Sequence, residues 1–128
     1  MKKIILFVNL CCVVSAMSHL HAQSIINKTW KTYIADPIND TAIFHIYADS
    51  SLITNLKGDV MVRNHCKITG DTLTIVDYGT EEQGCPDIKG RYRIAVTGDS
   101  FTLTLINDEC DGRSQALAGR KWTDATSK

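Results

Sequence analysis

Two stretches of the chain place a Thr-Gly-Asp turn between segments in which apolar and polar residues alternate. They are HCKITGDTLTIVD, residues 65–77, and YRIAVTGDSFTLTL, residues 92–105. A glycine at the first central position of a two-residue turn adopts the positive φ of a type II′ turn, whose twist matches that of antiparallel strands. Alternation with period two is typical of half-buried strands. Both stretches are therefore predicted to be β-hairpins.

The two turns also predict the register of each hairpin. In the first hairpin the predicted pairs are Thr69 with Thr72, Ile68 with Leu73, Cys66 with Ile75 and Asn64 with Asp77. In the second hairpin they are Val96 with Phe101, Ile94 with Leu103 and Tyr92 with Leu105. Apolar residues then face apolar partners, and one face of each hairpin is predicted to point into a core.

Other short segments of the chain are also predicted to be strands, at 28–34, 41–48, 51–56, 59–66 and around 120–123. One segment, 112–119, is predicted to be a helix of two turns that ends at Gly119. Short strands joined by tight turns predict an all-β fold, a small up-and-down antiparallel β-barrel of about eight strands with a short C-terminal helical turn. An open β-sandwich is the alternative, because strand spacing alone does not separate the two.

The first residues have the three parts of a secretory signal peptide. Lys2 and Lys3 precede an apolar run from residue 4 to 16, and Ala22 follows as a small residue at a cleavage site. The expected division is a signal peptide over 1–22 and a single β-barrel domain over 23–128, with cleavage after Ala16 as the alternative. The apolar run is too short for a stable membrane span. A secreted or periplasmic location follows from this pattern.

The charge balance excludes one class of partner. The chain has 14 basic and 14 acidic residues, and removal of Lys2 and Lys3 leaves 12 basic residues, a net charge of −2. With no basic patch in the sequence, no nucleic-acid partner is expected. No Walker loop, zinc-ligand spacing or Ser-His-Asp pattern is found, so no cofactor, metal or catalytic residue is expected. His65 and Cys66 are adjacent on a strand and point to opposite faces, which does not favour a shared site.

The cysteines predict a disulfide bond in the exported chain. Extension of the second hairpin places residue 87 opposite Cys110, so Cys85 and Cys110 are expected near its open end. Cys66 points inward on another strand. We therefore predict a Cys85–Cys110 disulfide in an oxidising compartment.

The second half of the chain resembles a known family. The segments GCPDIKGRYRI and GDSFTLTLINDECDGRSQALAGRKW contain Cys, Gly-x-Tyr, Gly-Asp, Asp-x-Cys-x-Gly-Arg, Leu and Gly-x-x-Trp in that order. With Trp30 on the first strand, this pattern resembles the small bacterial lipocalin-like proteins of the calycin group. The resemblance implies a small barrel whose interior is able to hold an apolar ligand, with Trp30 packed beneath Arg113 at one end. It does not imply an enzyme.

Two functions are compatible with such a barrel. A carrier of a small apolar molecule would bind its ligand through inward side chains, with polar groups at the mouth; the candidates are Tyr92, Phe101, Leu103 and Ile75, with Asp77 and Asn64 at the mouth. A cell-envelope interaction or structural module would have a filled barrel and act through loops, of which 78–90 is the longest. A barrel enzyme that uses Asp77 or Tyr92 is a third alternative. A cavity of about 300 Å³ or more favours the carrier.

Overall fold

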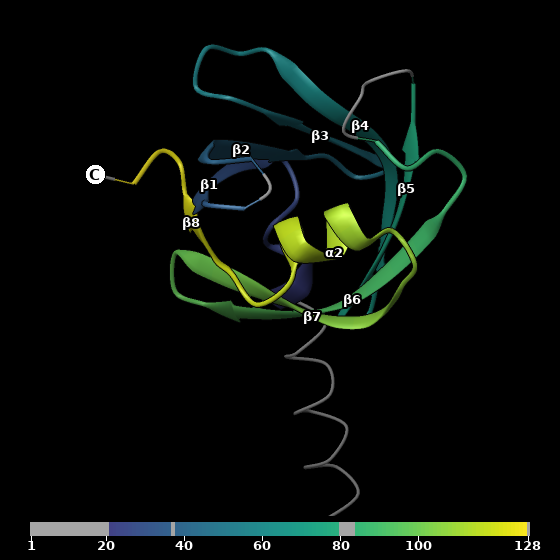
Figure 1. Cartoon of the computed structure of the whole chain (residues 1–128). Helices are drawn as coiled ribbons and strands as arrows, with labels where there is room; N and C mark the ends of the chain where they lie inside the picture. The colour runs from purple at the N-terminus through teal and green to yellow at the C-terminus, as the bar shows by residue number, and fades with distance from the viewer. Residues whose placement is uncertain (1–20, 37, 80–83, 128) are drawn as a thin grey trace, which may run out of the picture.

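The barrel closes on itself. The structure is a computed structural model that describes residues 21–36, 38–79 and 84–127, and within them eight antiparallel strands follow one another around the barrel in chain order (Figure 1). The strands are β1 (Lys28–Ile34), β2 (Asp40–Ile46), β3 (Ser50–Thr54), β4 (Val60–Thr69), β5 (Thr72–Tyr78), β6 (Lys89–Thr97), β7 (Ser100–Asp108) and β8 (Lys121–Asp124). Helix α2 (Asp111–Leu117) joins β7 to β8. The predicted fold class is confirmed.

The short strand β8 closes the sheet. It pairs with β7 at Phe101–Trp122 and with β1 at Trp30–Asp124, so the first and last strands share one ladder. The sandwich alternative is therefore wrong. Among the described residues, no helix is both long enough and apolar enough to cross a membrane.

Both predicted hairpins are present with the predicted registers. In the first, Asn64 lies opposite Asp77, and in the second, Val96 lies opposite Phe101. Gly70 has φ 62° and Gly98 has φ 60°, whereas the aspartate after each glycine keeps a negative φ. Positive φ at the first central position alone is the conformation expected of a type II′ turn.

Aromatic side chains fill the middle of the barrel. Trp30 meets Phe101 edge to face at a centroid distance of 4.9 Å, and Phe44 lies 5.2 Å from Trp122. All four side chains are at most 1% exposed. Large aromatic groups from four neighbouring strands, β7, β8, β1 and β2, thus pack together in the core, where they bury much apolar area.

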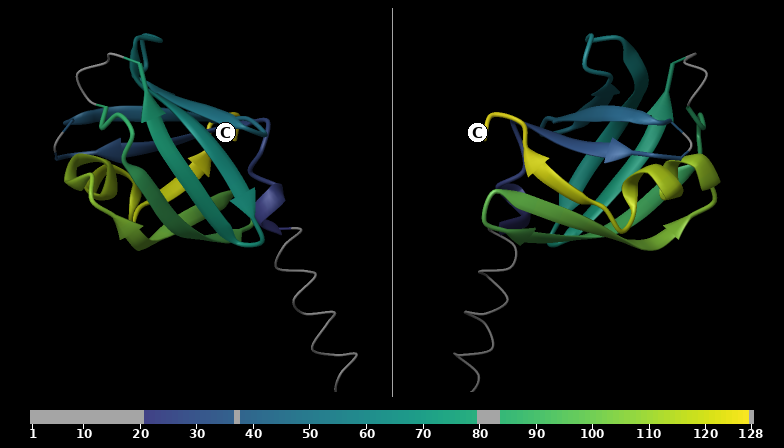
Figure 2. Two further views of the ribbon diagram at one scale, coloured as in Figure 1. Left: turned by 90° about the vertical axis from the view of Figure 1, so that its right-hand side faces the viewer. Right: turned by 60° about the vertical axis from the view of Figure 1, so that its left-hand side comes forward.

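The two ends of the barrel are covered by different segments (Figure 2). A helical turn at residues 21–23 lies at one end, and α2 lies at the other. Ala22 and Ile25 are buried in the core, and the indole Nε1 of Trp30 donates a hydrogen bond of 3.1 Å to the carbonyl of Ile25. Ala22, the last residue of the predicted signal peptide, therefore packs with the barrel; residues 1–20 lie outside the described part of the chain.

Leu105 departs from the predicted inward set. It lies opposite Tyr92 as predicted, but it is 46% exposed. The ladder between β6 and β7 shifts at this point, so that Ile106 is an extra residue in β7. A β-bulge of this kind bends its strand away from a regular ladder. The prediction that Leu105 lines the interior is wrong.

Candidate functional site

Arg113 is the centre of a buried polar cluster at the α2 end of the barrel. Its Nε donates to Oδ2 of Asp108 and its Nη2 donates to Oδ1 of the same carboxylate, each over 2.7 Å. The Nη2 group also donates to the carbonyl of Ile88 over 2.7 Å. The side chain of Arg113 is 5% exposed and that of Asp108 is fully buried. One guanidinium thus links α2, the end of β7 and the segment before β6.

A second carboxylate lies on the other side of the guanidinium. Nη1 of Arg113 is 2.9 Å from Oδ1 of Asp77, and this carboxylate also accepts hydrogen bonds from the side chain of Asn64 and from the backbone N–H of Cys85. Ser51 in turn donates to Oδ1 of Asn64 over 3.1 Å. Asp77 and Asn64 therefore form the polar pair that the hairpin register predicts, and their hydrogen-bonding groups are used within the protein.

The Asp108 carboxylate accepts two further hydrogen bonds, one from the hydroxyl of Tyr92 and one of 2.9 Å from the N–H of Cys110. Gly90 allows this arrangement. A Cβ at Gly90 would overlap the carboxylate of Asp108 and lie 3.1 Å from Nη2 of Arg113. The glycine is therefore required by the close approach of Asp108 to the β6 backbone.

The cluster fixes the charge state of its members. Burial by itself would raise the pKa of Asp108, but the hydrogen bonds from Arg113, Tyr92 and the Cys110 N–H lower that pKa below its usual value. Burial and the bond to Asp108 both raise the pKa of Tyr92. Burial would lower the pKa of Arg113, but Asp108 and Asp77 raise it. Asp108 and Arg113 are therefore charged at neutral pH and Tyr92 is neutral.

A disulfide bond joins the cluster to the neighbouring loop. Cys85 and Cys110 are bonded as predicted, with their Cα atoms 6.1 Å apart, and Cys66 is a buried free thiol. The two sulfurs lie within 4.8 Å of a carboxylate oxygen of Asp77. Because the sulfurs are bonded to each other and Arg113 already pairs with that carboxylate, this group is a structural cluster in the oxidised protein.

The structure contradicts the stacking of Arg113 on Trp30 that the family resemblance implies. The guanidinium of Arg113 is held between Asp77 and Asp108 at the α2 end. Trp30 is bonded to Ile25 near the opposite end, where the Lys28 ammonium lies 5.8 Å from its ring centroid. The buried carboxylates attract the guanidinium more strongly than an aromatic face does, because both charges are shielded from water.

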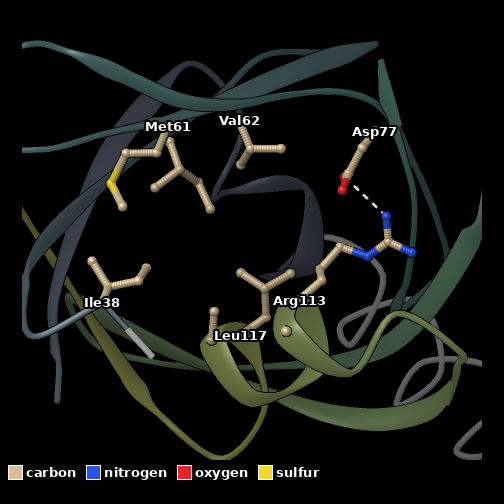
Figure 3. A pocket seen from close by; sticks show the side chains of 9 residues that line it. Ile38, Met61, Val62, Asp77, Arg113 and Leu117 are labelled. Atoms are coloured by element: carbon tan, nitrogen blue, oxygen red, sulfur yellow. Dashed lines mark ion pairs between the residues drawn. The ribbon is translucent and has the colours of Figure 1, made fainter. Parts of the chain in front are cut away.

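A small cavity lies between α2 and the barrel wall (Figure 3). Its volume is about 60 Å³, enough for a few water molecules. Its walls are mainly apolar, and the Asp77–Arg113 ion pair is at one side of it. The lining residues are Ile38, Ile53, Met61, Val62, Asp77, Gly112, Arg113, Ala116 and Leu117. A second hollow of about 260 Å³ is open to solvent beside Asn27, Tyr47 and Thr126, outside the barrel interior.

The predicted ligand-binding residues are distributed differently. Tyr92, Phe101, Leu103 and Ile75 point inward as predicted, but each is 0% exposed and belongs to the packed core. Of the six candidates, Asp77 lines the cavity and Asn64 supports it through a hydrogen bond. Asp77 and Tyr92, the residues of the enzyme alternative, are both bonded within the cluster.

Asp108 and Gly90 are not among the site residues predicted from the sequence. Both belong to the motifs that carry the family resemblance, Gly-x-Tyr at residues 90–92 and Asp-x-Cys-x-Gly-Arg at residues 108–113. In the structure these two motifs and Cys85 meet in one cluster. The occurrence of both motifs in one sequence therefore indicates the buried ion pair between Asp108 and Arg113. Comparison with family models, curated proteins and solved structures found no match to this chain.

Proposed function

We propose that this protein is an exported binding module that uses a filled barrel as a rigid scaffold and contacts its partners through its outer surface. The observation that carries this proposal is the size of the cavity that the described residues line at the α2 end of the barrel. At about 60 Å³ it is far smaller than the roughly 300 Å³ or more of a typical small-molecule site. In a small eight-stranded barrel, side chains are able to fill the interior completely.

The construction of the α2 end also supports a scaffold. The segment around Cys85 is held by a disulfide to Cys110, by a hydrogen bond to Asp77 and by the bond from Arg113 to the Ile88 carbonyl. These bonds hold the end of the barrel in one position, and preorganised surfaces lose less entropy when they bind. Residues 80–83 of the predicted binding loop lie outside the described residues.

Export and family membership are parts of the same proposal. The signal-peptide pattern favours export, and a disulfide bond is typical of proteins outside the reducing cytosol. The resemblance to lipocalin-like proteins rests on motif residues that here form the Arg113 cluster and the barrel end. These residues support the proposal that this chain and those proteins close a small barrel in the same way. They do not indicate which ligand, if any, this barrel binds.

A second candidate function is the binding of a small apolar molecule at the α2 end. The apolar lining of the cavity favours it, because Ile38, Met61 and Val62 surround a space with one polar side. Methionine adapts its shape easily, which helps a pocket to fit different molecules. A ligand of ordinary size would have to move α2 outward.

Probe uptake by the folded protein tests these functions against each other. The protein, purified from its own host, is titrated with an anilinonaphthalene sulfonate and with a fluorescent fatty acid, and its mass is measured under native conditions. We expect no saturable uptake, a mass equal to that of the chain after signal-peptide cleavage with no ligand added, and saturable binding to envelope fragments of the host.

One outcome would support the carrier instead. In that outcome the protein takes up one probe per chain. Met61→Trp, which fills the cavity, abolishes the uptake, and Leu105→Trp on the exposed surface leaves it unchanged. This result would reject the filled scaffold. Near-ultraviolet circular dichroism of each variant checks that the barrel is intact.

A further inference from the structure

Strands β4, β5 and β6 form a continuous wall on the side of the barrel away from β1 (Figure 2, left). Their outward positions align in rows across the three strands. The rows are Arg63–Tyr78, His65–Val76–Lys89, Lys67–Thr74–Arg91 and Thr69–Thr72–Arg93. Each row is set by the same hairpin registers that place the core residues on the inner face.

Basic residues gather on the two outer strands of this wall. Strand β4 presents Arg63 and Lys67 with His65 between them, and β6 presents Lys89, Arg91 and Arg93. Five of these six side chains are exposed and Arg63 is half-buried. The expectation that the chain has no basic patch is therefore wrong. The basic residues alternate with other residues along β4 and β6, and β5 separates these strands in the sequence. They therefore form one surface only after the sheet has folded.

Acidic side chains do not balance this charge on the wall itself. Every residue of β4, β5 and β6 is described, and the one acidic residue among them is Asp77, which is 2% exposed on the inner face. Asp71 in the hairpin turn pairs with Arg93 over 3.6 Å at the edge of the surface. Within β4, β5 and β6 the outward basic side chains therefore outnumber the acidic ones, although Arg63 and Arg93 each have a partner.

The shape of the wall suits an extended chain. Strand spacing places the basic residues of β4 about 9 to 10 Å from those of β6, and consecutive outward residues on a strand about 6.7 Å apart. Between them β5 presents the short side chains of Thr72, Thr74 and Val76, which are half-buried. Long basic side chains thus flank short neutral ones along β5, with threonine hydroxyls between them, and we call this strip of surface the trough.

We propose that this trough binds an extended acidic polysaccharide, with uronate carboxylates between the basic residues of β4 and β6 and sugar hydroxyls against Thr72 and Thr74. The proposal rests on the proposed function, since it names the partner of the surface-acting module. Arginine matches a carboxylate through two parallel hydrogen bonds, and threonine both donates to and accepts from a hydroxyl. A stiff sugar chain on a rigid barrel loses little conformational entropy on binding.

Other anionic partners fit the surface less well. Single-stranded nucleic acid binds by stacking bases on aromatic side chains, and the outward tyrosine of β4–β6, Tyr78, is already stacked on His65 with ring centroids 4.3 Å apart. A lipid surface requires apolar anchors beside the basic residues. Of the four outward residues of β5, two are threonine, Val76 is half-buried and Tyr78 is stacked on His65. An acidic peptide has no open strand edge to pair with, because the sheet is closed.

Fluorescently labelled polygalacturonate tests the proposal by anisotropy at low and physiological ionic strength. We expect saturable binding that weakens as salt is added, since exposed charges are screened. The double variant Lys67→Gln/Arg91→Gln, which changes one row across the trough, should bind about tenfold more weakly. Lys67→Arg/Arg91→Lys should retain binding, because the charge is kept.

The matched control is Lys31→Gln/Lys121→Gln, which removes the same charge from exposed positions on β1 and β8. It should change the dissociation constant less than about twofold if the trough is the site. An equal loss of affinity in the control, or no binding of polygalacturonate by wild-type protein, overturns the proposal. Tighter binding of single-stranded DNA, polyglutamate or phosphatidylglycerol vesicles also overturns it and identifies the other class of partner.

The outcome is separable from that of the proposed function. If polygalacturonate does not bind while the protein still excludes apolar probes and binds envelope fragments, the polysaccharide proposal alone is rejected. If an apolar probe binds inside the barrel, the scaffold function is rejected whatever the trough binds.

Discussion

Arg113 and Asp108 form a bidentate ion pair inside the α2 end of the barrel, with two parallel hydrogen bonds of 2.7 Å. The pair joins the first turn of α2 to the end of β7, and Asp77 on β5 adds a second carboxylate. A planar guanidinium is the side chain best suited to such a fork. Both side chains are shielded from water, so the loss of either one leaves a buried charge without its partner.

Replacement of Arg113 by lysine should destabilise the protein. An ammonium group cannot reach Asp108, Asp77 and the Ile88 carbonyl together, so buried acceptors lose their partners. We expect Arg113→Lys to lower the free energy of unfolding in urea at pH 7 by about 3 kcal/mol. Arg120→Lys is the control, since Arg120 bonds backbone carbonyls at the surface, and it should cost less than about 0.5 kcal/mol. Equal stability of the two variants would contradict the buried fork.

The lowered pKa of Asp108 predicts acid sensitivity. Because its pKa in the folded protein lies below the unfolded value of about 3.9, the carboxylate stabilises the fold fully above that value. This stabilisation is lost as the pH falls through the folded pKa. Urea unfolding from pH 7 to pH 2.5 should therefore show wild-type stability falling below about pH 4. The stability difference between wild type and Asp108→Asn should narrow over the same range, and a difference that stays constant would contradict the prediction.

Loss of the disulfide bond should cost stability through the unfolded chain. Cys85 and Cys110 are 25 positions apart, and closure of such a loop stabilises by about 3 kcal/mol in the chain-entropy model. We expect this loss in Cys85→Ser/Cys110→Ser by urea unfolding. In Cys66→Ala, peptide mapping without reductant should still show the bond. In the wild-type protein, a disulfide between Cys66 and either Cys85 or Cys110 would be inconsistent with the structure.

Gly90 provides a test of the close approach of Asp108 to β6. A methyl group at residue 90 would overlap the carboxylate and move it from Arg113. Gly90→Ala should therefore lower the free energy of unfolding by about 2 to 3 kcal/mol. Gly112→Ala, at a position with nothing within 4 Å and in a helix, should be neutral or stabilising by up to about 1 kcal/mol. An unchanged urea midpoint in Gly90→Ala would contradict the close approach of the Asp108 carboxylate to the backbone of β6.

The position of the mature N-terminus also has a measurable consequence. Ala22 is 1% exposed and packs in the core, so a chain that starts at Gln23 lacks a buried methyl group and part of the helical turn. A chain that starts at Met17, after the alternative cleavage site, should be more stable by about 1 kcal/mol. Thermal unfolding of the two chains compares them, and N-terminal sequencing of protein purified from its own host identifies the form that occurs. Identical unfolding curves would show that Ala22 adds nothing.

The sequence predicted those features that depend on neighbouring residues. The Thr-Gly-Asp turns determine two registers, and those registers place Asn64 opposite Asp77 and bring Cys85 near Cys110. Turn type and alternation are local properties, which explains why they can be predicted from one chain. Closure of the barrel and the contact of β1 with β8 agreed with the predicted topology.

The contacts of Arg113 could not be predicted in the same way. Its partners come from β5 and from the end of β7. Whether its guanidinium contacts the indole of Trp30 or the carboxylates of Asp77 and Asp108 depends on which of these groups is buried at the same end of the barrel. The basic wall depends on the pairing of β4 with β5 and of β5 with β6, so its charge is dispersed in the sequence. The cavity volume depends on how closely the inward side chains pack. The alternation of apolar and polar residues predicts which side chains point inward, but not how well they fit together.

The place of β8 in the barrel affects the order in which the chain completes its fold. Strand β8 is short, follows α2, and supplies the ladder that joins β7 to β1. Until residues 121–124 are available, β1 and β7 are two open edges at the ends of a curled sheet. Contacts between residues so distant in the chain form slowly, because a large loop must close first. A chain emerging from a ribosome therefore reaches its closed form only after residues 121–124 have emerged, so the unclosed chain is the form that is exposed to edge-to-edge association.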